Sequence, residues 1–224
     1  MPFIDVTFVD NPEPRCPCVL LLDTSGSMQG APIDSLNQGL ELFAAELMQD
    51  RLAQKRVEVA VITFGDQVSL IQDFCSPASF IPPILHASGS TPMGEAVVQG
   101  MQIIENRKAS YKQAGVTYFR PWIFLITDGA PTDANTHYWR QAVESVRIGE
   151  ANRHLLFFGV AVKDADRGML DQLCPANRQS MKLSGLSFRA LFTWLSSSLK
   201  SVSSANPGSQ LALPSPNSWA IIDV

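Results

Sequence analysis

The sequence predicts an α/β fold: an open, doubly wound, mostly parallel sheet of six strands with one antiparallel edge strand. Short, nearly continuous apolar runs alternate with stretches of helical periodicity from about residue 16 to residue 200. Such runs are typical of strands covered by helices on both faces of a parallel sheet. At 224 residues the chain is long enough for one such domain with a sizeable core.

Four apolar runs predict parallel strands, at residues 18–22 (CVLLL), 57–64 (VEVAVITF), 121–127 (PWIFLIT) and 155–162 (LLFFGVAV). The segments between them repeat apolar residues every three or four positions, which indicates helices with one buried face. These stripes are Ile33, Leu36, Leu40, Phe43 and Leu47; Met93, Val97, Met101 and Ile104; Trp139, Val143 and Val146; and Phe188, Leu191, Leu195 and Leu199.

One connection interrupts the alternation and predicts the antiparallel strand. Only Gly65 and Asp66 separate VEVAVITF from QVSLIQDF, whereas a parallel crossover needs a dozen or more residues. The two segments should therefore form a hairpin. A short helix, a weak strand near Met181 to Leu183 and a final helix complete the expected order.

The chain divides into an N-terminal lead-in (1–15), the α/β domain (16–200) and a tail (201–224) rich in Ser, Pro and Asn. The composition of the tail is typical of a flexible segment. Its apolar residues, Trp219 above all, favour a segment that docks on the domain or on a partner.

Composition argues against several classes of function. The formal net charge is -4 and the sequence shows no basic cluster, so we expect no nucleic-acid partner. The first 15 residues lack the pattern of a secretory signal, and no apolar run is long enough to cross a membrane. Four cysteines without CxxC spacing predict buried free thiols and a reduced, cytoplasmic setting.

Three polar loops are candidates for a binding site: DTSGSM after the first strand, TDGAPTD after the strand at 121–127, and HASGSTPMGEA before the helix near Met93. In open α/β sheets, ligands bind beyond the carboxyl ends of the strands, where the winding reverses. Each loop alone also fits ordinary turn or helix-start chemistry, with Thr91 as a helix cap. Together they offer Asp23, Ser25, Ser27, Thr91 and Asp128.

These five side chains provide two carboxylates and three hydroxyls, without nitrogen or sulfur. Such a set suits a hard cation, Mg²⁺ or Mn²⁺, rather than Zn²⁺. Two carboxylates balance the charge of a divalent ion, and neutral hydroxyls leave it electrophilic. We therefore expect the ion to attract a carboxylate from outside the chain.

The motifs VLLLDTSGSM, STPMGEAV and FLITDGAPTD, in this order, resemble a von Willebrand factor A (VWA) domain with an intact metal-ion-dependent adhesion site. The resemblance covers roughly residues 16–200 and implies a sheet of order 3-2-1-4-5-6. It also implies that Ser25, Ser27 and Thr91 contact the metal directly or through water, and that Asp23 and Asp128 act at first or second shell. VWA domains are adaptors and receptors rather than enzymes, so the metal would accept an acidic side chain of a protein partner.

The phrase GSTPMGEAV, the compact layout and the Ser/Pro tail with its late Trp are also similar to bacterial TerY-type proteins of tellurium-resistance clusters. That resemblance implies a role in the response to tellurite and chemical stress, with kinase and phosphatase partners.

Two alternatives remain at the level of sequence. A metal-dependent phosphoester hydrolase would use Asp23, or a serine with a nearby base such as His86 or His137. A structural subunit would use the metal only to tie the loops together.

Asp133 either caps the helix that follows it or adds negative charge beside the metal.

Overall fold

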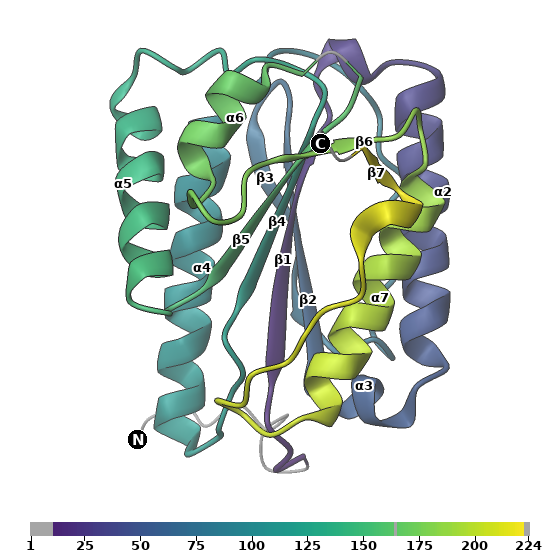
Figure 1. Ribbon diagram of the computed structural model, residues 1–224, viewed down its shortest axis with the longest axis vertical. Helices are drawn as coiled ribbons and strands as arrows, with labels where there is room; N and C mark the ends of the chain where they lie inside the picture. Colours follow the sequence, from purple (N-terminus) through teal and green to yellow (C-terminus); the bar gives the residue numbers. More distant parts are fainter. Residues whose placement is uncertain (1–10, 164, 222–224) are drawn as a thin grey trace.

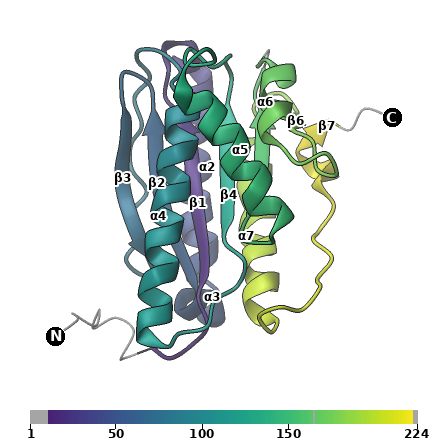
Figure 2. The same ribbon diagram turned by 90° about the vertical axis from the view of Figure 1, so that its left-hand side faces the viewer.

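The computed structural model describes residues 11–163 and 165–221, which form three layers (Figure 1). A twisted central sheet lies between two layers of helices. Helices α2 (Ala31–Met48), α3 (Arg51–Arg56) and α7 (Phe188–Ser204) cover one face. Helices α4 (Met93–Ala114), α5 (His137–Ala151) and α6 (Arg167–Leu173) cover the other, as the rotated view in Figure 2 shows.

The sheet has the order β3-β2-β1-β4-β5-β6-β7. Its strands are β1 (Cys16–Asp23), β2 (Val57–Phe64), β3 (Val68–Cys75), β4 (Trp122–Thr127), β5 (Leu156–Ala161), β6 (Met181–Leu183) and β7 (Ala220–Ile221). The expected order of the first six strands and the antiparallel β2–β3 hairpin are confirmed. The tail adds β7, antiparallel to β6 at the opposite edge.

Two short elements were not expected from the sequence. Helix α3 has only six residues, too few to show an apolar stripe. Its start is fixed by Asp50, whose side chain accepts hydrogen bonds from the backbone N–H groups of Leu52 and Ala53. Strand β7 has two residues, and it is held by pairing rather than by its own β propensity.

Alternation along β1 divides the core in two. Val19 and Leu21 pack against the α4 and α5 layer, and Leu20 and Leu22 against the α2 and α7 layer, as the period of two in a strand requires. Cys16 and Cys18 face the same side as Leu20 and are buried free thiols, while Cys75 and Cys174 are free and partly buried.

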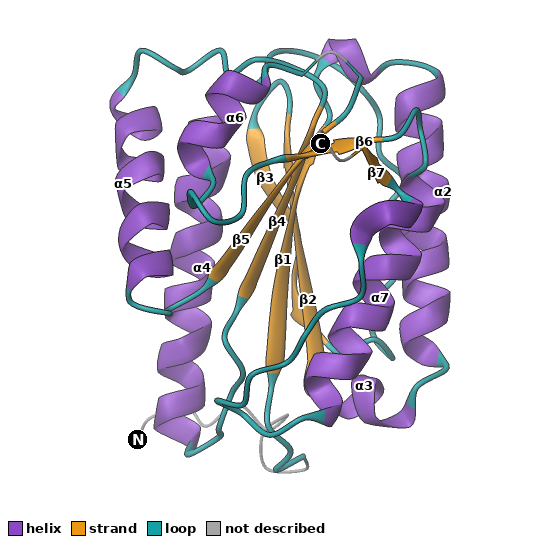
Figure 3. Ribbon diagram, in the orientation of Figure 1, coloured by secondary structure: helices purple, strands orange, loops and turns teal. Residues whose placement is uncertain are grey.

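The outer edge of β5 is only half paired, because β6 bonds to it at Val160 and Ala161 alone. Two side chains replace the missing strand at Phe157. Its N–H donates to Glu150 Oε1 at 2.6 Å, and its carbonyl accepts a hydrogen bond from Arg178 at 2.8 Å. Figure 3 shows that β6 is much shorter than β5 beside it. Over the remainder of this edge, the ion pair between Glu150 and Arg178 takes the place of a backbone ladder.

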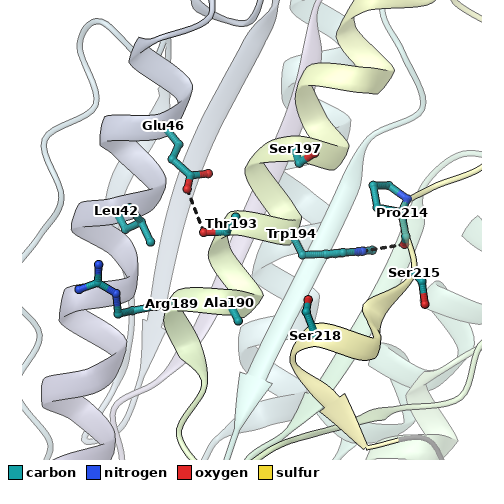
Figure 4. Close-up of a pocket in the computed structure, with 10 residues that line it drawn as sticks. All are labelled: Leu42, Glu46, Arg189, Ala190, Thr193, Trp194, Ser197, Pro214, Ser215 and Ser218. Carbon is teal, nitrogen blue, oxygen red and sulfur yellow. Dashed lines mark hydrogen bonds between the residues drawn. The ribbon is translucent and has the colours of Figure 1, made fainter.

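The C-terminal segment, residues 205–221, runs back along the α7 face toward β6 (Figure 1). Trp219 is fully buried, with its ring 5.5 Å from that of Trp194. Trp194 also donates its indole N–H to the carbonyl of Pro214 at 2.8 Å (Figure 4). Between this segment, α2 and α7 lies a depression of about 570 Å³.

None of the helices in the described part of the chain combines the length and the apolarity needed to cross a membrane.

Candidate metal centre

The three predicted loops meet at one edge of the sheet. Strands β1 and β4 are parallel neighbours, so Asp23 at the end of β1 and Thr127 at the end of β4 reach the same edge. The first loop continues through a short 3-10 turn, Gly26–Met28, and the third segment leads into α4. This edge is where the doubly wound topology places ligands.

Backbone hydrogen bonds hold the loops together. Ser88 N–H donates to the carbonyl of Thr24 at 2.7 Å, and Gly26 N–H donates to that of Gly89 at 3.1 Å. The loop after β4 is tied to the same segment, because Thr132 N–H donates to the carbonyl of Thr91 at 2.9 Å. The relative placement of the site residues is thus set by main-chain contacts.

Four of the five predicted residues form one hydrogen-bonded chain. Ser27 Oγ donates to Asp128 Oδ1 at 2.5 Å and lies 3.0 Å from Ser25 Oγ. Ser25 N–H donates to Asp23 Oδ1 at 2.8 Å. The two carboxylates are therefore linked through the two serines.

Thr91, the fifth predicted residue, joins the group beside Gly129. A side-chain carbon added at Gly129 would lie 3.3 Å from Thr91 Oγ1 and 3.8 Å from Ser27 Oγ. The two hydroxyls thus flank the same small space, which any larger residue at position 129 would fill. Thr91 is itself buried.

The carboxylates of Asp23 and Asp128 are both buried. Asp23 has no exposed surface, and burial raises its pKa above the usual value, with the nearby charge of Asp128 adding to the rise. Hydrogen bonds from Ser25 and from the hydroxyl of Thr127, at 2.5 Å, act in the opposite direction. A buried carboxylate next to a second one favours a compensating cation.

The side chain of Asp133 does not cap α5, the helix that follows it in the chain. Its carboxylate accepts hydrogen bonds from the backbone N–H groups of Gly94 and Glu95, at 3.1 and 2.9 Å. It therefore caps the N-terminus of α4, the preceding helix in the chain, rather than α5. Helix α4 begins at Met93 with Pro92 at the N-cap position and no side-chain cap there, so the expectation that Thr91 caps it was wrong.

The donor set fits a hard divalent cation such as Mg²⁺ or Mn²⁺ and not a zinc site of His and Cys ligands. Within residues 11–163 and 165–221, no three His, Cys, Asp or Glu side chains converge as a metal cluster. An ion at this edge would depend on hydroxyl oxygens and water for most of its ligands, which Mg²⁺ and Mn²⁺ accept and Zn²⁺ rarely does. Ser25, Ser27, Thr91, Asp23 and Asp128 are the residues that would hold it.

The model of the von Willebrand factor type A domain family matches residues 18–190, most of the chain and all three loops. The chain belongs to this family. Over 147 residues the VWA domain is 26% identical to inter-alpha-trypsin inhibitor heavy chain H4 from Sus scrofa, covering 62% of this chain. It spans only 15% of the length of that relative.

Solved structures share the fold at low sequence identity. The VWA domain superposes on the pilus adhesin SpaC from Lactobacillus rhamnosus GG with a TM-score of 0.65 at 13% identity, covering 84% of this chain and 30% of that one. For the vWF domain of the type V pili tip protein Mfa5 from Porphyromonas gingivalis the TM-score is 0.60 at 12% identity, covering 82% and 94%. The ArnB paralog VWA2 from Sulfolobus acidocaldarius gives 0.51 at 17%, covering 83% and 45%.

Two residues of the VWA domain at this edge were not singled out from the sequence. Thr127, the last residue of β4, donates its hydroxyl to Asp23 and accepts the N–H of Gly129 at 3.2 Å. Lys163 follows β5 and lies beside Asp128. They lie at the carboxyl ends of β4 and β5, which are parallel neighbours on one side of β1, and that topological position was the signal that could have identified them.

Proposed function

We propose that this VWA domain binds Mg²⁺ or Mn²⁺ through Ser25, Ser27, Thr91, Asp23 and Asp128, and recruits a protein partner through an acidic side chain. VWA domains are general protein-interaction and adhesion modules. The observation that carries the proposal is the hydrogen-bonded link from Asp128 through Ser27 to Ser25, which brings oxygens from two distant loops to one point.

The roles of the residues follow from their hydrogen bonds. Both oxygens of Asp23 are engaged by Ser25 and Thr127, which suits a carboxylate that orients ligands and balances charge. The serine hydroxyls and Asp128 point toward one another and are available as direct ligands. When bound, the ion supplies an electrophilic centre to which a carboxylate of the partner can bind.

Titration calorimetry with MgCl₂ and MnCl₂ tests the metal site. We expect binding by the unmodified chain, at least a tenfold loss of affinity in Ser27→Ala and Asp23→Ala, and unchanged binding in Ser204→Ala, a control at an exposed serine of α7. Absence of divalent binding by the unmodified chain, or equal affinity in all variants, contradicts the proposal.

The cellular role we propose is that of a cytoplasmic adaptor in a bacterial response to tellurite or chemical stress, with kinase and phosphatase partners. The similarity of GSTPMGEAV and of the late Trp to TerY-type proteins supports it. Affinity capture with the whole chain, with Mg²⁺ or with chelator, tests both parts of this role. We expect specific partners that are lost with chelator and with Asp128→Asn; partners retained under both conditions contradict metal-dependent recruitment.

The hydrolase alternative makes a separate prediction. In the part of the chain that the structure describes, the hydroxyls of Ser25 and Ser27 bond to each other and to Asp128, and none of these bonds involves a histidine. Turnover of phosphate esters that disappears with Asp23→Ala would support that alternative over an adaptor. If the metal only ties the loops together, chelator should lower thermal stability without any effect on partner capture.

A further inference from the structure

A second cavity, of about 770 Å³, lies at the end of the sheet opposite to the metal centre. Its walls come from the beginnings of β4 and β5, the C-terminal half of α4 and the C-terminal segment. It adjoins the half-paired edge of β5. Its volume falls in the range of small-molecule sites, about 300–1,000 Å³.

Positive charge concentrates in this cavity although the chain as a whole carries a net charge of -4. Five cationic side chains line it, with Glu105 as the one carboxylate in the lining: Lys108, Lys112, Arg120, Arg153 and Arg178. They come from four separate parts of the sequence, which is why no basic cluster is visible in the sequence alone.

Only some of these cationic side chains form ion pairs within the chain. Lys108 pairs with Glu105 at 2.7 Å. Arg120 and Arg178 share a single carboxylate, that of Glu150, each at 2.7 Å. Among the described residues neither Lys112 nor Arg153 has an ion-pair partner.

Arg120 is left short of acceptors. Its Nε is buried and has no hydrogen-bond partner within the described residues. Burial is the main cause that lowers the pKa of Arg120. The charge and hydrogen bond of Glu150 act in the opposite direction, and the charges of Arg178 and Arg153 lower the pKa further. An anion in the cavity would relieve this repulsion, and a guanidinium is well suited to bind phosphate oxygens.

Much of the remaining lining is apolar, with Ser209, Gln210 and His154 as polar members. Trp122, Leu156 and Phe158 come from the sheet, and Leu211 and Leu213 come from the C-terminal segment. Leu211 is 46% exposed, so it offers uncovered apolar surface on one side of the cavity. The arrangement favours a ligand with an anionic end and an apolar or aromatic body.

We propose that this cavity binds a small organic phosphate of the nucleotide class, with the phosphate held by Arg120, Arg153 and Lys112 and the ring against Leu211 and Leu213. The proposal is independent of the metal centre. The site lies at the other end of the sheet, and its ligand is neither a divalent cation nor a protein carboxylate.

Titration calorimetry of the whole chain in EDTA, with adenosine monophosphate and with inorganic pyrophosphate as probes, tests the proposal without the metal site. We expect both probes to bind. Lys112→Ala with Arg153→Ala should weaken both at least tenfold. Leu211→Ala should weaken only adenosine monophosphate, by a few-fold, because pyrophosphate has no ring to pack.

Arg147→Ala is the matched control, since Arg147 is an exposed arginine of α5 paired with Glu144. It should leave both affinities unchanged. Circular dichroism should show the same thermal midpoint for every variant, because the altered residues are on the surface. No binding of either probe at millimolar concentration, or an equal loss in Arg147→Ala and in the double variant, would overturn the proposal.

Discussion

The ammonium group of Lys163 lies 3.9 Å from Asp128 Oδ2 and 3.5 Å from the carbonyl oxygen of Ser27. Lys163 has a positive φ of 51°, an uncommon conformation for a residue other than glycine. Its charge is therefore placed beside the carboxylate on which a bound ion would depend. At the proposed metal site, a lysine in this position would compete with a divalent cation for Asp128.

Replacing Lys163 with methionine should raise the affinity for Mg²⁺. The side chain of Lys163 is 41% exposed, so solvent weakens its pairing and the gain should be modest, at most about fivefold for an interaction of roughly 1 kcal/mol. Calorimetry of Lys163→Met beside Lys55→Met, an exposed lysine in α3, measures the effect. A fall in affinity in Lys163→Met would show that the ammonium supports the ion.

Replacing Asp133 with alanine should destabilise the fold by about 1 kcal/mol, the usual effect of losing a helix cap. Two N–H groups of α4, at Gly94 and Glu95, would lose their acceptor. Urea unfolding measures the difference. Asp133→Asn keeps one acceptor oxygen, so its free energy of unfolding should lie between those of the unmodified chain and Asp133→Ala. An unchanged stability of Asp133→Ala would contradict the capping role.

We expect the two partly buried thiols, Cys75 and Cys174, to make the fold less stable at alkaline pH. Burial, with the charges of Glu58 and Asp73, raises the pKa of Cys75 from 9.0 to about 11, and burial raises that of Cys174 to about 12. The folded chain holds these protons more tightly than the unfolded chain does. Stability is therefore unaffected by these groups below about pH 9 and falls as the pH rises toward 11.

The rate of alkylation measures the pKa shift on which that prediction depends. Because the thiolate is the reactive form, the rate at which iodoacetamide modifies Cys75 in the folded chain should rise about tenfold per pH unit from pH 8 to pH 10. The urea-unfolded chain should level off above pH 9. A rate for the folded chain that levels off at the same pH would mean that the thiol is not perturbed.

Because Trp219 is buried, we expect the C-terminal segment to stabilise the domain. Its ring is fully buried against Trp194, so Trp219→Ala should cost about 3–5 kcal/mol. Its indole N–H is buried without a partner in the described residues, so Trp219→Phe, which removes that group, should cost much less. Thermal unfolding of both variants tests this, and equal losses would contradict it.

The sequence was sufficient to predict the sheet because strands buried on both faces are nearly pure apolar runs, and the two-residue link Gly65-Asp66 permits only a hairpin. It was insufficient where pairing across the chain decides the structure. Strand β7 exists because Lys182 and Leu183 bond to it. Asp133 caps α4 through a contact between residues 38 and 39 positions apart.

The residues of the candidate site likewise differ in how far the sequence could predict them. Asp23, Ser25 and Ser27 carry a local pattern, and Ser25 and Ser27 are neighbours in the structure as in the sequence. Lys163 carries no local pattern, since one lysine after a strand is unremarkable. Its position became meaningful only when the register of β4 and β5 placed it beside Asp128.

The link between Ser27 and Asp128 joins residues 101 positions apart, and that between Asp23 and Thr127 joins residues 104 apart. Closing a loop of that length costs conformational entropy. Formation of the sheet brings these residues together without an ion, so ion binding would not have to supply that free energy. A fragment that ends before β4 would carry the DTSGSM loop but neither Asp128 nor Thr127. Ion binding at the proposed site would therefore require the native long-range topology, and it would distinguish the native chain from partly folded forms that retain only the β2–β3 hairpin.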